Sequence, residues 1–278
     1  ALVSKVHSAM VPTRRTYEIV LVDDGSKDGS WDKMVALSSQ YPCLHLIRFR
    51  RNFGQTAAMS AGFNESHGKI IITMDADLQN DPSDIPRLLE KIDEGFDVVS
   101  GWRRDRKDTF INRRLPSILA NWLISRITGV HLHDYGCTLK AYRREIVQNI
   151  QLYGELHRFI PALASWVGGT ISEVVVTHHP RQFGKSKYGI GRTLRVVLDL
   201  VTVNFLLRYS TRPIHVFGKW GLIAGSLGIL ILGGIVAAHA SFRIFGTQFA
   251  AELIKRPFWV ISPFMLIFFG LQFISMGL

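Results

Sequence analysis

The stretch "KIIITMDADLQND" at residues 69–81 joins a run of apolar side chains to two aspartates and a glutamine. Side chains alternate between the two faces of a strand, so Asp75, Asp77 and Gln79 point to one side if the extended backbone continues that far. Close carboxylates repel each other, and a divalent cation with oxygen ligands relieves that repulsion. Because Mg²⁺ commonly binds one or two carboxylates together with substrate phosphates, the stretch predicts a metal site for a diphosphate-bearing substrate.

A solvated turn is the alternative interpretation of these acids. Carboxylates cost little at the wet end of a strand, and one of them would cap the helix that is predicted to start after Pro82. The D-x-D pair alone is weak evidence, since about one such pair is expected by chance in a chain of this length. The position of the pair within the fold therefore has to distinguish a metal site from a solvated turn.

The residues around this stretch alternate between strand-like and helix-like runs. Apolar runs typical of strands lie at residues 17–26, 44–49, 69–77 and 96–103. Runs typical of helices lie at residues 28–40, 54–66 and 82–95. Repeated βα units indicate an α/β fold with a mostly parallel sheet, in which ligands bind beyond the carboxyl ends of the strands.

Two long uncharged segments lie near the C-terminus of the sequence. Residues 220–242 and 257–278 contain no Asp, Glu, Lys or Arg, and each is long enough to cross a bilayer as a helix. Buried core helices are the alternative, but both segments are apolar all round. They predict a transmembrane hairpin, and the basic residues before it favour a cytoplasmic location for residues 1–215.

Two predicted helices before the hairpin combine basic residues with an apolar face. They lie at residues 110–130 and 191–209. Such faces pack on a protein core or lie in a membrane interface, and the sequence leaves both open. The predicted organisation is a catalytic domain at 1–190, a juxtamembrane amphipathic helix at 191–215 and the hairpin at 216–278.

The chain of 278 residues has a net charge of +11, which suggests an anionic partner. Basic residues follow a predicted strand at Arg103 and Arg104 and recur in "PRQFGKSKYG" (180–189), a candidate phosphate clamp for which a solvated basic turn is the alternative. This is no P-loop, because His179 stands where that motif needs glycine. No nucleic-acid recognition motif is present. The two isolated cysteines indicate neither a disulfide framework nor a zinc site, which fits a reducing compartment.

Five motifs in order now carry a resemblance: "VDDGSKDGS", "RNFGQTAAMSAG", "DADLQNDP", "DYGCTLKAYRR" and "RQFGKSKYG". Followed by a two-helix hairpin, they resemble family 2 glycosyltransferases that act on polyprenyl phosphate. Within that family the chain is similar to dolichyl-phosphate mannose synthases and, through its paired C-terminal helices, to bacterial polyprenyl-phosphate glucosyltransferases. The resemblance covers nearly the whole chain. It implies a GT-A fold, a nucleotide-sugar donor, Mg²⁺ or Mn²⁺ as cofactor, inversion at the sugar carbon and a polyprenyl phosphate acceptor.

The resemblance also implies roles for individual residues. The implied donor-binding residues are Asp23, Asp24, Gly25 and Asp75. The implied metal ligands on the donor diphosphate are Asp75, Asp77 and Gln79. The implied phosphate-binding residues are Arg103, Arg104, Arg181, Lys185, Ser186 and Lys187. Members of the family begin with a strand similar to "IPVYNE", and this sequence starts after it, so we expect the native N-terminus to be absent.

Asp134 matches the acidic position near the acceptor, which makes it the candidate catalytic residue. Ordering the turn before Gly136 is its alternative role. A phosphate monoester has its second pKa near 6, so the acceptor is already mostly a dianion at pH 7 and hardly needs a base. We therefore expect Asp134 to position the acceptor more than to remove a proton.

The sequence thus predicts a metal-dependent hexosyltransferase that moves glucose from UDP-glucose to undecaprenyl phosphate. We expect a multi-pass protein of the inner (plasma) membrane with its catalytic domain in the cytoplasm. A GDP-mannose-dependent mannose synthase and a non-catalytic membrane-tethered scaffold are alternatives. A processive polysaccharide synthase is disfavoured, because residues 157–169 lack a Q-x-x-R-W motif. We expect no nucleic-acid partner, and self-association into a homo-oligomer is left open.

Overall fold

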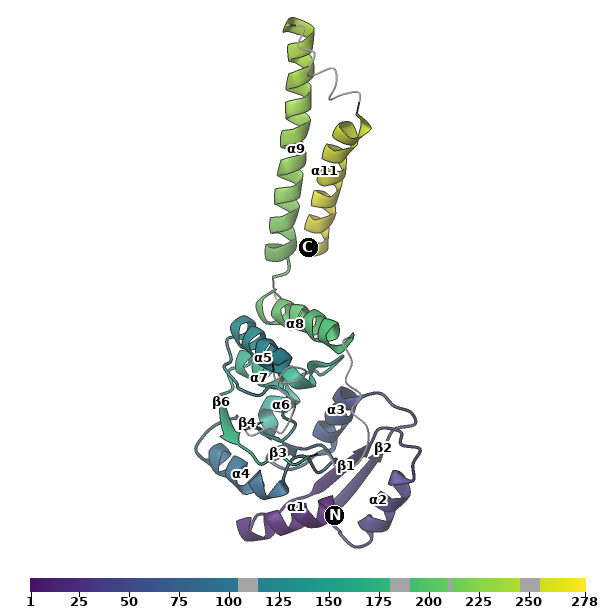
Figure 1. The fold of residues 1–278 in the computed structure, drawn as a ribbon, viewed down its shortest axis with the longest axis vertical. Coiled ribbons are helices and arrows are strands. Elements are labelled where there is room, and N and C mark those ends of the chain that lie inside the picture. Colours follow the sequence, from purple (N-terminus) through teal and green to yellow (C-terminus); the bar gives the residue numbers. More distant parts are fainter. Residues whose placement is uncertain (105–114, 181–190, 210–211, 246–255) are drawn as a thin grey trace. The chain divides into compact units, whose positions relative to one another are not determined.

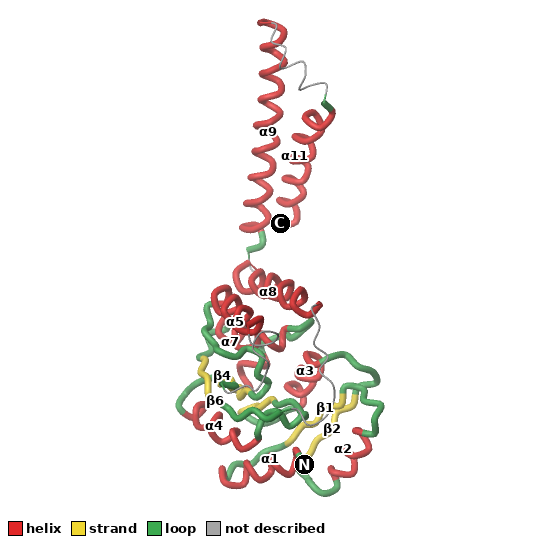
Figure 2. Tube along the Cα trace, in the orientation of Figure 1, coloured by secondary structure: helices red, strands yellow, loops and turns green. Residues whose placement is uncertain are grey.

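The computed structural model describes residues 1–104, 115–180, 191–209, 212–245 and 256–278 (Figure 1). The chain divides into two units, residues 1–204 and residues 205–278. Short strands alternate with helices in the first unit, and two long helices make up most of the second (Figure 2).

The regular elements follow the predicted alternation. The strands are β1 (Ile19–Asp23), β2 (Leu44–Arg48), β3 (Ile70–Thr73), β4 (Val98–Trp102), β5 (Lys140–Arg143) and β6 (Ile171–Val175). The helices are α1 (Leu2–Met10), α2 (Ser30–Ser38), α3 (Gln55–Glu65), α4 (Ile85–Asp93), α5 (Leu115–Thr128), α6 (Arg144–Gln148), α7 (Ile160–Trp166), α8 (Gly191–Tyr209), α9 (Ile214–Phe245) and α11 (Pro257–Gly277). Short 3-10 turns are η1 (Val11–Thr13), η2 (Pro82–Asp84) and η4 (Leu156–Phe159).

The strands form two sheets. β1 and β2 pair in parallel, from Ile19 opposite Leu44 to Asp23 opposite Arg48. The other strands lie in the order β3-β5-β4-β6. β5 runs antiparallel to both of its neighbours while β4 and β6 are parallel, so β3, β4 and β6 share one direction. The predicted α/β class with mostly parallel strands is confirmed, with β5 as the reversed strand.

Apolar side chains cover both faces of the four-stranded sheet. Val98 and Val99 are adjacent and fully buried on opposite faces, because neighbouring strand residues alternate. Val99 packs in a cluster with Met10 of α1 and four buried residues of α4. Val98 packs in a second cluster with residues of α3, α6 and α7, among them Phe63 and Ile160. With both faces covered, the strand ends are where a ligand can approach the sheet.

The strand that carries the acids is shorter than the sequence indicates. β3 ends at Thr73, and the turn that follows includes Leu78 with a φ of 60°. The backbone N–H of Gln79 donates to Asp77 Oδ1 at 3.1 Å, which closes a turn through an aspartate side chain. Since a left-handed residue interrupts the extended backbone, the prediction that strand alternation aligns Asp75, Asp77 and Gln79 is wrong.

Helices α5 and α8 each combine buried and exposed apolar residues. In α5, Ile124 is buried while the side chain of Trp122 is 58% exposed. In α8, Leu200 and Val203 are buried while Leu198 is 57% exposed. Among the residues whose side chains are described, each helix therefore has a core face, and each also presents apolar surface of the kind that enters a membrane interface.

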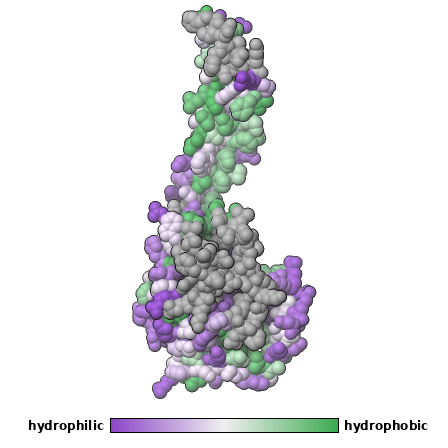
Figure 3. All heavy atoms as spheres, in the orientation of Figure 1, coloured by the Kyte–Doolittle hydropathy of each residue, from purple (hydrophilic) through white to green (hydrophobic). Residues whose placement is uncertain are grey.

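The second unit is the predicted pair of apolar helices. α9 and α11 are long and apolar enough to cross a membrane, and they are the two candidate spans in the described part of the chain. Core helices of soluble proteins are mostly buried, whereas only 11% of each apolar window is buried here. Apolar side chains gather over both helices in Figure 3. The alternative of buried core helices is therefore disfavoured.

Small residues hold the two helices of this unit together. A Cβ atom on Gly221 would lie 2.6 Å from the carbonyl oxygen of Gly270, and one on Gly228 would lie 2.7 Å from the carbonyl oxygen of Pro263. Residues seven apart lie almost two helical turns apart and so share a face. The glycines let the backbones approach closely, as is common between helices in membranes.

Candidate active site

The reversed strand β5 determines what lies at the carboxyl ends of β3 and β4. Its first residue, Lys140, is in register with Thr73 of β3 and Ser100 of β4. An antiparallel strand begins where its neighbours end. The segment 134–139 therefore lies at the edge of the sheet where the acids follow β3 and the arginines follow β4. This edge is the candidate active site.

Asp75 is the central acid of this edge. Its Oδ1 accepts a hydrogen bond of 2.9 Å from Nε2 of Gln55, the first residue of α3. Burial, and then the neighbouring Asp77 carboxylate, raises the pKa of the Asp75 carboxyl, while a hydrogen bond with Thr138 and the charge of Arg103 act to lower it. The structure thus brings the two aspartates within electrostatic range, although they do not share a strand face.

The aspartate pair fits the oxygen chemistry of a divalent metal. A cation would stabilise the two neighbouring carboxylates, of which Asp75 has the raised pKa, and Mg²⁺ commonly takes only one or two protein carboxylates. Within the described residues, no group of three or more His, Cys, Asp or Glu side chains is placed to hold a metal ion. The predicted ligand Gln79 follows in the same turn, where its carbonyl oxygen accepts a bond of 2.8 Å from the N–H of His179.

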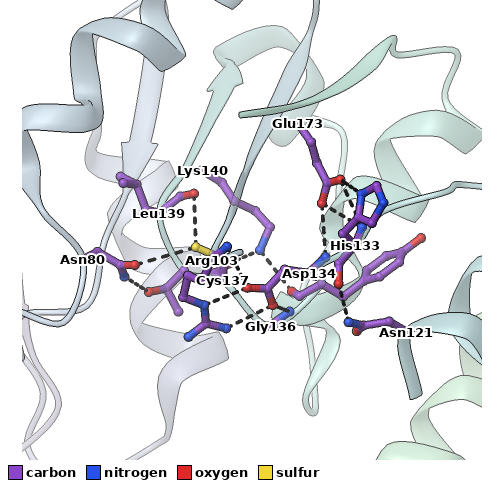
Figure 4. Close-up of polar contacts among 12 residues, drawn as sticks. Asn80, Arg103, Asn121, His133, Asp134, Gly136, Cys137, Leu139, Lys140 and Glu173 are labelled. Atoms are coloured by element: carbon purple, nitrogen blue, oxygen red, sulfur yellow. Dashed lines mark hydrogen bonds and ion pairs between the residues drawn. The ribbon is translucent and has the colours of Figure 1, made fainter. Parts of the chain in front are cut away.

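Arg103, which is partly buried, forms an ion pair with the buried Asp134. Arg103 Nε donates to Asp134 Oδ2 at 2.7 Å, and its Nη2 donates to Oδ1 at 3.1 Å, which is the two-pronged geometry that suits a guanidinium and a carboxylate. The N–H of Gly136 also donates to Asp134 Oδ1 at 3.1 Å, and Asp134 is 2% exposed. The motifs suggest separate tasks for these two residues, whereas the structure makes them partners (Figure 4).

Glu173 of β6 holds the backbone at His133 and Asp134. Its carboxylate accepts the backbone N–H of His133 at 2.9 Å and that of Asp134 at 3.1 Å. It also bonds His133 Nδ1 at 2.8 Å, and the His133 ring stacks on Trp102 with 4.1 Å between centroids. Glu173 was not predicted from the sequence, because β6 was not among the predicted strands.

Two further buried polar residues were missed. The Lys140 side chain is 3% exposed, and its ammonium donates to the carbonyl oxygens of Tyr135, at 3.1 Å, and Cys137. Burial lowers the pKa of Lys140. His157 Nδ1 lies 2.7 Å from the hydroxyl of Thr56 in α3. Burial, and then the charges of Arg158 and Lys140, lowers the pKa of His157 to about 4. A lysine inside the quoted motif "DYGCTLKAYRR" was the available sequence signal.

Three of the four predicted donor-binding residues, Asp23, Asp24 and Gly25, lie at the carboxyl end of β1. The Asp24 carboxylate accepts the N–H groups of Phe53, at 2.6 Å, and Gly54, at 2.9 Å. Asp23 Oδ1 accepts the N–H of Ser26 at 3.0 Å. Gly25 has a φ of 73°, and a Cβ atom there would lie 2.6 Å from the carbonyl carbon of Arg51. These contacts fix the loop before α3, whose first residue, Gln55, reaches Asp75.

The predicted basic loop lies outside the described residues, which leaves Arg181, Lys185, Ser186 and Lys187 as predictions. The chain just before it contacts the acid turn, because Asn80 pairs with His178. His179 Nε2 also bonds Asp81 Oδ2 at 2.8 Å. Burial acts to raise the pKa of Asp81, but hydrogen bonds from Ser83 and His179 outweigh it and lower the pKa to about 2. Arg104 follows Arg103 at the end of β4, where its N–H donates to the Trp102 carbonyl oxygen.

The sheet, with acids at its carboxyl edge, agrees with the GT-A fold that the sequence resemblance implies. A solved structure of glucosyl-3-phosphoglycerate synthase from Mycobacterium tuberculosis, in complex with Mn²⁺, uridine-diphosphate and glucosyl-3-phosphoglycerate, has a TM-score of 0.54 at 16% identity. The likeness covers 75% of this chain and 76% of that chain, and it shows the shared fold. The family model of glycosyl transferase family 2 matches residues 2–151. The chain belongs to this family, which confirms the resemblance seen in the sequence.

Two relatives are similar over most of their length. A dodecaprenyl-phosphate galacturonate synthase of Rhizobium johnstonii is 44% identical over 286 residues, which cover 93% of this chain and 84% of the relative. An undecaprenyl-phosphate 4-deoxy-4-formamido-L-arabinose transferase of Klebsiella pneumoniae is 39% identical over 279 residues, which cover 100% of this chain and 81% of the relative.

Proposed function

We propose that this chain transfers a sugar from a nucleotide-sugar donor to the phosphate of a polyprenyl phosphate lipid. The observation that carries the proposal is the meeting of Asp75 and Asp77 with the Arg103–Asp134 pair at one sheet edge. Acids suit a metal-bound donor diphosphate, and a fixed guanidinium suits a phosphate. The names of the two relatives, which specify dodecaprenyl and undecaprenyl phosphate, support the class of acceptor.

The sugar is the finer part of the proposal. The relatives are named for galacturonate and for 4-deoxy-4-formamido-L-arabinose, and neither name supports the glucose predicted from the sequence. We therefore place galacturonate first among the donors to be tested, with UDP-glucose and GDP-mannose as the competing donors. Fold likeness alone does not select among sugars, because specificity belongs to the pocket.

Each side chain has a task in this proposal. Asp75 and Asp77, with Gln79 as the third predicted ligand, would hold a divalent ion, Mg²⁺ or Mn²⁺, which would supply positive charge next to the leaving diphosphate. Gln55 and Thr138 orient the Asp75 carboxylate. The basic residues Arg104, Arg181, Lys185, Ser186 and Lys187 are further phosphate contacts inferred from sequence.

Asp134 acts on the acceptor through Arg103. Both of its carboxylate oxygens already accept hydrogen bonds, and a phosphate monoester with its second pKa near 6 is mostly a dianion at pH 7. We infer that Asp134 fixes the guanidinium that meets the acceptor phosphate. Proton removal is not needed for the attack.

The membrane anchor is the pair α9 and α11. Basic residues cluster where α9 begins, at Arg212, His215 and Lys219, and the positive-inside rule then favours the cytoplasmic side for this end. We infer an inner-membrane protein whose catalytic unit meets its lipid substrate at the cytoplasmic face. The exposed Trp122 and Leu198 supply apolar surface for contact with that face.

The test is sugar transfer by the purified full chain in detergent with undecaprenyl phosphate. UDP-galacturonate, UDP-glucose and GDP-mannose are supplied separately, and the lipid-linked product is measured by mass spectrometry. We expect one donor to give product, a chelator to stop the reaction, and Asp77→Asn to abolish it. The exposed acid Asp32 provides the control, since Asp32→Asn should leave the rate unchanged. A rate that survives the chelator contradicts the metal, and absence of product with every donor contradicts the function.

A further inference from the structure

Lys140 is a buried cation at the centre of the candidate active site. Its side chain is 3% exposed, and its ammonium donates to the carbonyl oxygens of Tyr135, at 3.1 Å, and Cys137. The ammonium also interacts electrostatically with the carboxylates of Asp134 and Asp75. Figure 4 shows the side chain reaching back into the turn formed by the residues just before it.

The segment 134–139 is tied to its neighbours at its C-terminal end. The Thr73 hydroxyl donates to the Thr138 carbonyl oxygen at 2.8 Å, and Asn80 Nδ2 donates to the Thr138 hydroxyl at 3.0 Å. The strand β4 approaches closely because it has Gly101 here, where a Cβ atom would lie 2.8 Å from the Leu139 carbonyl oxygen. These contacts leave no room for the segment to shift toward β4.

The middle of the segment is held by the lysine instead. The carbonyl oxygens of Tyr135 and Cys137 point to the Lys140 ammonium, and both residues are buried. A buried carbonyl that loses its donor is costly, so replacing the ammonium by an apolar group would favour a different loop path. Asp134, at the N-terminal end of the segment, would move with it, whereas Thr138 stays bonded to Thr73 and Asn80.

We propose that Lys140 is a positioning residue for sugar transfer: its ammonium fixes the middle of the segment 134–139 and so presents Asp134 to Arg103. The inference rests on the proposed function. Lys140 acts through these residues and does not touch the substrate. Misplacement of a reacting or binding group by about 1 Å can cost on the order of 10²-fold in rate, so the expected effect is large.

Three variants of the full chain test the role. Lys140→Met keeps most of the side-chain volume and removes the donors, and Lys140→Arg keeps a cation. Tyr142→Phe is the matched control, because Tyr142 is fully buried and, two residues on, lies on the same face of β5. We expect kcat to fall about 100-fold in Lys140→Met and about tenfold or less in Lys140→Arg, with the donor KM within about threefold of wild type. Tyr142→Phe should stay within about threefold of wild type in both kcat and the donor KM.

Hydrogen exchange supplies a readout that does not depend on activity. Amides of the segment 134–139 should exchange at least tenfold faster in Lys140→Met, while those of α1 and α4 should be unchanged and Tyr142→Phe should match wild type. Unchanged exchange in the segment, or a kcat within threefold of wild type, overturns the proposal. If Lys140→Met is not recovered folded, a parallel loss of donor affinity and kcat in Lys140→Arg overturns it, and a selective loss of kcat supports it. A wild-type chain that forms no lipid-linked sugar refutes the proposed function, and the exchange result then decides the role of Lys140 separately.

Discussion

The buried His157 should make the catalytic unit sensitive to mild acid. In the folded chain burial lowers its pKa to about 4, whereas an exposed histidine titrates near 6.5. The folded pKa of His157 lies below its unfolded pKa. The contribution of the neutral imidazole to the free energy of unfolding is therefore fully present above pH 6.5 and is lost as the pH falls towards 4. The difference is worth about 3 kcal/mol at ~1.4 kcal/mol per pKa unit. Below about pH 4 both states bind the proton, and the dependence ends.

The assay compares His157→Asn with wild type, because an asparagine side chain stays neutral and can keep a hydrogen bond to the Thr56 hydroxyl. The melting temperature of the full chain in detergent is measured by tryptophan fluorescence from pH 7.5 to pH 4.5. At roughly 2–4 °C per kcal/mol for a domain of this size, wild type should lose about 5–10 °C more than the variant over this range. His131→Asn is the control, since His131 is an exposed histidine that should not alter the slope. If the melting temperatures of wild type and His157→Asn fell equally with pH, His157 would not be the source of the acid sensitivity.

Three other substitutions test the site and the anchor. Asp134→Asn should lower kcat at least ~100-fold while nucleotide binding stays near normal, because it removes the carboxylate that orients the partly buried guanidinium of Arg103; a rate that recovers at pH 9 would instead indicate a lost base. Gly270→Leu should lower the melting temperature of the hairpin, whereas Gly233→Leu, at a site with open space, should not; equal effects would contradict the close helix contact. Replacing Lys185 and Lys187 together with alanine should raise the Michaelis constants for phosphate-bearing substrates, and unchanged constants would support a solvated turn.

Local pattern was sufficient to predict most of the fold. β1, β2 and β4 lie inside the predicted runs, and α2, α3 and α4 begin within three residues of the predicted starts. These elements have periodic apolar residues and clear boundaries, so a short window of sequence contains their signal. The paired C-terminal helices were predictable for the same reason, since an uncharged apolar run of this length is typical of a transmembrane helix.

The elements that complete the site were harder to predict. β5 has four residues, two of them basic, and it forms only because it pairs with β3 and β4, which lie far from it in the sequence. The turn after β3 contains Leu78 in a left-handed conformation, which glycine or asparagine usually adopts and which a leucine does not predict. The pairing of β5 with distant strands and the left-handed conformation of Leu78 thus decide where Asp75 and Asp77 lie. Neither feature is visible in local periodicity.

The reversal of β5 explains why roles inferred one by one from motifs missed the interactions among them. A fourth parallel strand in that place would end at this edge and contribute only the residues that follow it. An antiparallel strand contributes the residues that precede it, so Asp134 enters the edge from the opposite direction and meets Arg103, which leaves β4. The same reversal buries Lys140 within electrostatic range of Asp75 and Asp134, because the first residue of β5 is level with the ends of the neighbouring strands. Arg103, which the sequence suggested for a substrate phosphate, is therefore first stabilised by Asp134, and this contact orders its guanidinium.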